Sequence, residues 1–398
     1  QSRTLRKYPQ NIAAHLLGYI GEVDKRITDN DAYYSEGDYL GISGIEKAYE
    51  KELRGIKGLK IVMVDVHNLE KGSFENGNYD TLAIPGKNLV SSLDADLQQY
   101  GEQLMQNKIG GIVAIEPSTG EVLTVITSPT YDPNLLVGRT RSSNYAKLAM
   151  DTIGVPLFNR ALMAYYPPGS TFKLINGLIG QQERVLFPDT RYPCHRGYPV
   201  MNGKPACHAH ASPLDLKSSV QHSCNSYYAY VFRSIIDNDK YKSAEEGYRA
   251  WRDYVLSFGI GKKLNSDLPQ ELKGYVPTAE YYNKYFGKGQ WKSSTIVSLS
   301  IGQGELGVTP LQMANIMATI ANRGFYYTPH VIQFVGDKKY VHPEYAVKNY
   351  TKIDPKFFDV MIEGMEQVVE AGTARIAKLD SIIICGKPGT AQNTHGKA

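Results

Sequence analysis

Pro167-Pro-Gly-Ser-Thr-Phe-Lys173 is the segment from which both the architecture and the chemistry of this 398-residue chain can be inferred. It stands directly before Leu174-Ile-Asn-Gly-Leu178, so the Pro-Pro-Gly stop predicts a helix with Ser170 in its first turn. Lys173 follows three residues later, which places its amine beside the Ser170 hydroxyl. A desolvated, neutral lysine can take a serine's proton, and N–H groups at a helix N-terminus can stabilise an oxyanion. The segment predicts a nucleophilic serine with a lysine base; the alternative is a capping serine beside a solvated lysine.

Two more short motifs follow in the chain. Ser223-Cys-Asn225 offers a hydroxyl that can relay a proton to a leaving amine, and an amide that can hold both Lys173 and a substrate carbonyl. Lys387-Pro-Gly-Thr390 offers a fixed cation, close approach of a substrate backbone at Gly389, and a hydroxyl and N–H on Thr390. Each motif alone is equally explained by a polar turn. Together, Ser-x-x-Lys, Ser-x-Asn and Lys-x-Gly-Thr follow the order found in serine acyl-transfer enzymes that react with penicillin.

The composition is that of an ordinary globular protein, with 42 % hydrophobic and 21 % charged residues. This excludes a disordered tail and a disulfide-stapled miniprotein, and the length predicts two or three domains. The net charge of +4, without a long Lys/Arg block, argues against a nucleic-acid surface. No apolar run approaches the ~18 residues of a membrane span, and no signal peptide is present. Since the first residue is Gln1, we expect a piece of a longer chain.

The hydrophobic pattern predicts a mixed α+β fold. We expect strands at 60–66, 112–116, 121–126 and 381–385, with a hairpin turn at 117–120. We expect a helix from a Ser43/Glu46 capping box to Gly55, one capped by Asp94, one capped by Thr309, and one after Asp354. The second helix should carry Leu97, Tyr100, Leu104 and Met105 on one face, and the last should carry Phe358, Met361, Ile362, Met365 and Val369 on its inner face.

Longer segments resemble a known family. Together with the three short motifs, four of these segments resemble the class B penicillin-binding proteins of the elongation type. They are Tyr39-Leu-Gly-Ile-Ser-Gly-Ile-Glu46, Ser128-Pro-Thr-Tyr-Asp-Pro-Asn134, Ile301-Gly-Gln-Gly304 and Glu370-Ala-Gly-Thr-Ala374. The resemblance implies a transpeptidase fold, an antiparallel sheet flanked by helices, after a smaller mixed α/β pedestal. Residues 1–88 would be the pedestal or dimerisation-type domain, incomplete at its N-terminus. Residues 89–398 would be the transpeptidase domain, without its last strands and helix.

The resemblance also implies a mechanism. Ser170 would attack the penultimate D-Ala carbonyl of a peptidoglycan stem peptide, with Lys173 as base and Ser223 as proton relay. Asn225 would position the donor, and Lys387, Gly389 and Thr390 would bind its end. No cofactor is required for this acyl transfer.

The implied ligands and surroundings follow from the same resemblance. The ligands would be stem peptides and β-lactams, and the partners a RodA-type SEDS glycosyltransferase and the elongation machinery. The chain would be periplasmic, held to the inner membrane by an anchor outside these residues. The alternatives are a D,D-carboxypeptidase or β-lactamase on the same plan, and a non-catalytic penicillin-binding scaffold or sensor.

One position departs from the family pattern. Where the family usually has Thr or Ser, this chain has Pro388, which removes both a hydroxyl and an N–H. We expect weaker recognition of the substrate carboxylate and slower acylation by β-lactams.

Three of the four cysteines and four of the nine histidines lie between residues 194 and 224. Cys207, His210 and Cys224 would give three zinc ligands, and Cys194 or Asp189 would complete a tetrahedron. The spacing matches no standard zinc finger. The alternatives are a Cys194–Cys207 disulfide, permitted by the family's oxidising compartment, or no bond at all. Some elongation-type relatives hold a metal beside the active site, so the resemblance favours zinc.

Overall fold

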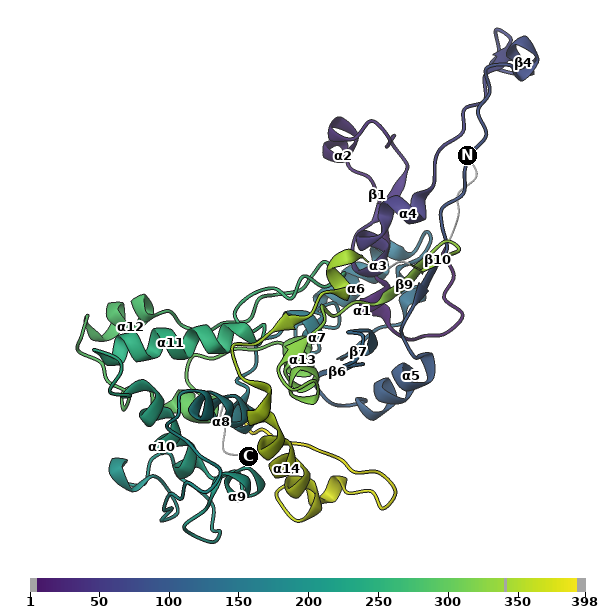
Figure 1. The fold of residues 1–398 in the computed structure, drawn as a ribbon. Coiled ribbons are helices and arrows are strands. Elements are labelled where there is room, and N and C mark those ends of the chain that lie inside the picture. The colour runs from purple at the N-terminus through teal and green to yellow at the C-terminus, as the bar shows by residue number, and fades with distance from the viewer. Residues whose placement is uncertain (1–5, 340–341, 392–398) are drawn as a thin grey trace.

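The structure is a computed structural model that describes residues 6–339 and 342–391. It is an α+β protein in which an elongated N-terminal part projects from a larger body of helices and short strands (Figure 1). Within the described residues, no helix combines the length and the hydropathy that a membrane crossing requires.

The N-terminal part is built from short elements. Two antiparallel pairs, β1 with β2 and β3 with β4, are separated by α3 and α4, and the β3–β4 hairpin forms the far tip in Figure 1. The bounds are α1 Ala14–Leu17, β1 Ile20–Glu22, α2 Lys25–Asn30, β2 Tyr39–Gly41, α3 Gly44–Ala48, α4 Glu50–Arg54, β3 Val62–Val64 and β4 Glu70–Ser73.

The strands of the larger body form three small antiparallel sheets. One has the order β10-β9-β5, and the others pair β6 with β7 and β8 with β11. The bounds are β5 Leu89–Ser91, β6 Gly110–Ile115, β7 Val122–Ser128, β8 Phe325–Tyr326, β9 Ile332–Val335, β10 Lys338–Lys339 and β11 Asn349–Tyr350.

Helix α8 lies at the centre of one group of helices, and its Leu174, Ile175, Leu178 and Ile179 are fully buried. Its polar Asn176 and Gln181 are buried as well, so every side of this helix lies in the core. Helices α10, α11 and α14 pack against it. The bounds are α5 Ala95–Leu104, α6 Arg141–Met150, α7 Arg160–Met163, α8 Lys173–Gln182, α9 Leu216–Gln221, α10 Asn225–Ile236, α11 Ala244–Ser257, α12 Ala279–Phe286, α13 Pro310–Ala321 and α14 Phe358–Glu370.

A buried carboxylate joins the two parts. Asp267 accepts hydrogen bonds from the Tyr49 hydroxyl at 2.9 Å and from the N–H groups of Val331 and Ile332 at 2.9 and 3.0 Å. Tyr49 lies between α3 and α4, and Ile332 begins β9. The N-terminal part is therefore fixed to a sheet of the larger body by a polar contact as well as by apolar packing.

Several predicted elements are confirmed. The β6–β7 hairpin is present, and Asp94 caps α5 by accepting from the N–H of Leu97. Thr309 and Gln312 form the reciprocal capping box of α13. Helix α14 follows a 3-10 turn that begins at Pro355, and of its five predicted inner residues all but Ile362 are buried.

Other predictions are wrong at particular residues. Ser43 makes no side-chain cap, because Glu46 pairs with Arg6 through two hydrogen bonds of 2.6 and 2.9 Å, and the predicted helix breaks at Tyr49. Residues 381–385 are not a strand, because no described strand pairs with them, and an extended segment needs a neighbouring strand.

The face of α5 that carries Leu97, Tyr100 and Leu104 points outward, since all three side chains are exposed. It buries Gln98 instead, which hydrogen-bonds both backbone groups of Val125 on β7 at 3.0 Å.

Candidate active site

Ser170 lies in a 3-10 turn, Gly169–Phe172, that leads directly into α8. This turn begins at a left-handed residue, Gly169, with φ of 58°. A Cβ on Gly169 would lie 2.7 Å from the carbonyl oxygen of Thr390. Only glycine therefore lets the third motif pack against the serine turn, and this packing places Thr390 beside Ser170.

Lys173 is fully buried one turn after Ser170. Its Nζ donates to the carbonyl oxygen of Ser223 at 2.6 Å, to the Ser223 hydroxyl at 3.1 Å and to Oδ1 of Asn225 at 2.5 Å. Burial, and after it the positive charge of Lys387, lower the pKa of Lys173 to about 7. A neutral amine is thus accessible near neutral pH, as the lysine base requires.

Ser223 lies in the tight turn before α10, and Asn225 is the first residue of that helix. Ser223 has a left-handed backbone with φ of 52°, a conformation that costs a non-glycine residue about 1–3 kcal/mol and that is concentrated at functional sites. The amide of Asn225 is held from its other end, because Nδ2 donates to the carbonyl oxygen of Ala206 at 2.6 Å. The turn therefore presents a hydroxyl and a fixed amide oxygen to Lys173.

The third motif lies across the serine turn. A Cβ on Gly389 would lie 2.9 Å from the carbonyl oxygen of Pro168, so this glycine also permits close backbone packing. Burial lowers the pKa of Lys387 to about 8, and its Nζ contacts the carbonyl oxygen of Pro388 at 3.3 Å. The structure thus brings together all seven residues expected from the three motifs: Ser170, Lys173, Ser223, Asn225, Lys387, Gly389 and Thr390.

Sequence reasoning missed two groups that hold this arrangement. Gln303 donates from Nε2 to the carbonyl oxygen of Thr390 at 2.8 Å, and Ala206 supplies its carbonyl oxygen to Asn225. Gln303 lies in the Ile301–Gly304 segment, whose family resemblance could have identified it as a residue near the site. The backbone contact of Ala206 carries no signal in the sequence.

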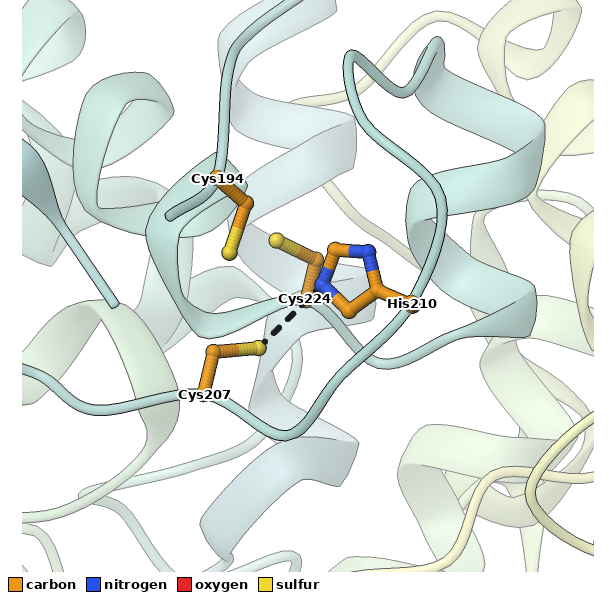
Figure 2. Close-up of side chains that lie close together, drawn as sticks. All are labelled: Cys194, Cys207, His210 and Cys224. Atoms are coloured by element: carbon orange, nitrogen blue, oxygen red, sulfur yellow. Dashed lines mark hydrogen bonds between the residues drawn. The ribbon is translucent and has the colours of Figure 1, made fainter. Parts of the chain in front are cut away.

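Cys194, Cys207, His210 and Cys224 form a compact cluster next to this site (Figure 2). Their sulfur and ring nitrogen atoms all lie within 4.8 Å of one another, and Sγ of Cys207 lies 3.3 Å from Nε2 of His210. All four cysteines of the chain are free thiols, so the Cys194–Cys207 disulfide is absent. Asp189 is exposed and lies outside the group, so the fourth candidate ligand is Cys194.

The donor set fits a zinc ion. Zinc–ligand distances of about 2.0–2.3 Å put ligand atoms of a tetrahedral site roughly 3.3–3.8 Å apart, and the donor atoms here lie within 4.8 Å of one another, with Cys207 and His210 at 3.3 Å. The sulfurs of Cys207 and Cys224 accept backbone N–H groups of Asn225 and Tyr227, at 3.4 and 3.3 Å, from the first turn of α10. A hydrogen bond from Cys224 lowers the pKa of the Cys207 thiol. Nδ1 of His210 lies 2.6 Å from the carbonyl oxygen of Ala211, which would leave Nε2 for a metal.

Two family models match the chain. The one described as "Penicillin binding protein transpeptidase domain" matches residues 110–398. The one described as "Penicillin-binding Protein dimerisation domain" matches residues 1–91.

Individual relatives agree with these matches. The chain is 31 % identical to the peptidoglycan D,D-transpeptidase MrdA of Acinetobacter baumannii over 98 % of its own length and 57 % of that protein. It is similar to Pseudomonas aeruginosa PBP2 in complex with WCK 5153, with a TM-score of 0.81 and 32 % identity over 98 % of this chain and 80 % of that one. It is also similar to PBP2 of Helicobacter pylori in complex with MreC, with a TM-score of 0.80 and 28 % identity over 98 % and 70 %.

Proposed function

The chain belongs to the penicillin-binding proteins with a transpeptidase domain, and we propose that it is a peptidoglycan D,D-transpeptidase of cell-wall elongation. The observation that carries this proposal is the buried Lys173, which stands one turn after Ser170 and is hydrogen-bonded to Ser223 and Asn225. The similarity to MrdA and PBP2 proteins supports the substrate class, and the chain spans 57 % of the MrdA length.

In the first half of the reaction, neutral Lys173 takes the proton of the Ser170 hydroxyl while Oγ attacks the penultimate D-Ala carbonyl of a stem peptide. The N–H groups of Ser170 and Thr390 stabilise the oxyanion. Ser223 passes the proton to the amine of the departing D-Ala, whose C–N bond breaks. Asn225 and Lys387 hold the donor peptide. An ester on Ser170 results.

In the second half, an amine of a neighbouring stem attacks the ester carbonyl. Its extra proton passes through the same relay to Ser170 Oγ, which leaves as the hydroxyl. A peptide cross-link forms and the free enzyme returns. β-Lactams acylate Ser170 by the first half of this route.

The deciding experiment is labelling with a fluorescent penicillin. We expect covalent label on the wild-type chain and none on Ser170→Ala, with the adduct mapped to Ser170 by mass spectrometry. If the wild type takes up no label, the proposed acyl transfer is wrong. Pro388 would then favour the scaffold role. Release of D-Ala from a stem peptide without cross-linked product would identify a D,D-carboxypeptidase, and rapid turnover of the adduct a β-lactamase.

We also propose domain roles, a cellular location and partners that agree with a transpeptidase of cell-wall elongation. Residues 1–88 act as the pedestal and residues from 89 onward as the transpeptidase domain, which is supported by the pairing of β5 with β9. The chain works in the periplasm, held by an inner-membrane anchor, beside a RodA-type SEDS glycosyltransferase. The complex of the similar H. pylori protein with MreC supports contact with the elongation machinery.

We propose that the Cys194/Cys207/His210/Cys224 cluster holds one structural zinc ion. Zinc would cross-link the loop 194–210 to the start of α10 and so hold the turn that carries Ser223 and Asn225. Metal analysis of the purified protein should find about one zinc per chain, and Cys194→Ala should lower this content and the melting temperature. Exposed Cys385 provides the matched control, because Cys385→Ala should leave zinc content unchanged. A protein purified without chelators that contains no zinc would contradict the proposal.

A further inference from the structure

Tyrosine is abundant in this chain, at 29 residues, and the proposed mechanism uses none of them. Four form a row that begins next to the serine turn, which we name the tyrosine strip: Tyr165, Tyr275, Tyr281 and Tyr285. The relative exposure of Tyr165, Tyr275 and Tyr285 is 45, 39 and 62 %. Packing in the core does not explain rings this exposed, and the rings of Tyr275 and Tyr285 each contact that of Tyr281.

The row starts on a small ladder beside Ser170. Tyr275 and Gly307 exchange backbone hydrogen bonds of 2.6 and 3.0 Å, and Tyr166 exchanges two of 2.9 Å with Val308. A Cβ on Gly307 would lie 3.2 Å from Cβ of Tyr165. Tyr275 pairs with Gly307, and Tyr165 is next to Tyr166, whose partner is the residue after Gly307. Because side chains alternate along a strand, those of Tyr165 and Tyr275 lie on one face, with Gly307 leaving room between the strands.

The row continues onto α12 through ring contacts. The ring centroids of Tyr275 and Tyr281 are 6.3 Å apart, and those of Tyr281 and Tyr285 4.6 Å. Polar groups border the rings. Glu305 accepts a hydrogen bond from the hydroxyl of the buried Tyr282 at 2.9 Å, and Nζ of Lys284 lies 6.0 Å from the Tyr285 ring.

The chemistry of this surface matches a carbohydrate. A pyranose ring has an apolar C–H face and polar groups around its edge, so it stacks on an aromatic ring and hydrogen-bonds to neighbouring polar side chains. A single row of rings with phenolic hydroxyls and charged neighbours suits a chain of sugars better than it suits the apolar centre of a protein interface, which is wider and poor in charge.

The distances also agree. Tyr165 stands five positions before Ser170, so the Cα atoms of the two residues lie no more than roughly 18 Å apart. A stem peptide whose reacting carbonyl is at Ser170 has about four residues between that carbonyl and its sugar, which span up to about 14 Å. A glycan at that distance from Ser170 lies within reach of Tyr165 when the stem peptide extends toward the strip.

We propose that the tyrosine strip binds the glycan strand of peptidoglycan whose stem peptide occupies the candidate active site. This inference rests on the proposed function for its ligand. It gives the site a specificity determinant outside the three motifs, because a stem peptide attached to a strand would bind more tightly than the free peptide.

The test uses glycan strands from which an amidase has removed all stem peptides, immobilised on a surface. We expect the wild-type chain to bind, and the double variant Tyr275→Ala/Tyr285→Ala to bind about ten-fold more weakly, the effect of losing two stacking contacts. Tyr285→Phe retains a ring, so its affinity should stay within about two-fold of wild type. The matched control is Tyr100→Ala, which removes an equally exposed tyrosine from α5 and should not change binding.

Melting temperatures establish that each variant is folded. If the double variant unfolds, the single variant Tyr285→Ala, at the most exposed position, takes its place. Equal binding by wild type and strip variants, or no binding by any of them, overturns the inference and leaves a contact surface for protein. Labelling of Ser170 by penicillin is scored separately, so loss of strand binding with intact labelling sinks the glycan assignment but leaves the acyl-transfer proposal standing.

Discussion

The side-chain oxygen of Asn225 accepts a hydrogen bond of 2.5 Å from Nζ of Lys173, while the nitrogen of the same amide is bound to Ala206. The amide thus fixes the position of the base from one side and depends on a neighbouring loop from the other. We predict that Asn225→Ala slows acylation of Ser170 by penicillin about 100-fold, the usual effect of removing one preorganised polar contact. Asn349→Ala, at a surface amide, should leave the rate unchanged. Equal rates in all three proteins would show that Asn225 has no part in acylation.

The low pKa of Lys173 predicts a pH dependence. Burial lowers this pKa to about 7, and only the neutral amine, present above the pKa, can accept a proton from Ser170. The acylation rate should rise from about pH 6 to 8 with its midpoint near 7, and Lys173→Arg should abolish it, because arginine stays charged. Stopped-flow measurement with a chromogenic cephalosporin gives the profile. A rate that is flat or falling over this range would contradict Lys173 as the base.

Pro388 is predicted to slow the reaction of this chain with β-lactams. Proline lacks the N–H and the hydroxyl that Thr or Ser would offer to the substrate carboxylate. Pro388→Thr should therefore raise the acylation rate several-fold. Pro388→Ala separates the two contributions, since it restores the N–H without the hydroxyl. Identical rates in the wild type and Pro388→Thr would disprove a role for this position in carboxylate binding.

Gly169 is predicted to be irreplaceable for a steric reason. In Gly169→Ala, the new Cβ would lie 2.7 Å from the carbonyl oxygen of Thr390, so Lys387–Thr390 would be displaced and labelling by penicillin lost. Gly138→Ala is the matched control. Gly138 also has a positive φ, 70°, but nothing lies within 4 Å of its Cβ position, so this variant should lose only about 1 kcal/mol of stability and keep its labelling. Normal labelling of Gly169→Ala would refute the packing argument.

The site could be predicted from the sequence where chemistry restricts residue types at short spacing. A serine, its lysine base and their partners must be those residue types, so the three motifs found Ser170, Lys173, Ser223, Asn225 and Lys387 as one group. The carbonyl of Ala206 escaped prediction because any residue has a carbonyl. Asp189 is near Cys194 in the sequence but is exposed and lies outside the cluster. Distance along the chain does not fix distance in space.

The fold was predicted well where local signals decide it and poorly where tertiary pairing does. The capping residues of α13 and the turn between β6 and β7 act within a few residues, and both are as expected. Helix α5 shows the opposite case. Its apolar residues share one face, but that face is exposed and Gln98 is buried, because the Gln98 amide satisfies both backbone groups of Val125, a contact made across 27 residues of sequence.

The tripeptide Ser223-Cys224-Asn225 contributes to two sites at once, because its outer residues bind Lys173 and its middle residue belongs to the cysteine–histidine cluster. This has a consequence for resistance by mutation. In a Ser-x-Asn motif whose middle residue has no other contacts, that residue can be exchanged without disturbing the outer two. Here a substitution at Cys224 removes a ligand candidate and the cap of α10 together, so we expect it to disturb the turn that carries Ser223 and Asn225. On the proposed function, we therefore expect resistance substitutions at positions such as Pro388 rather than at Cys224.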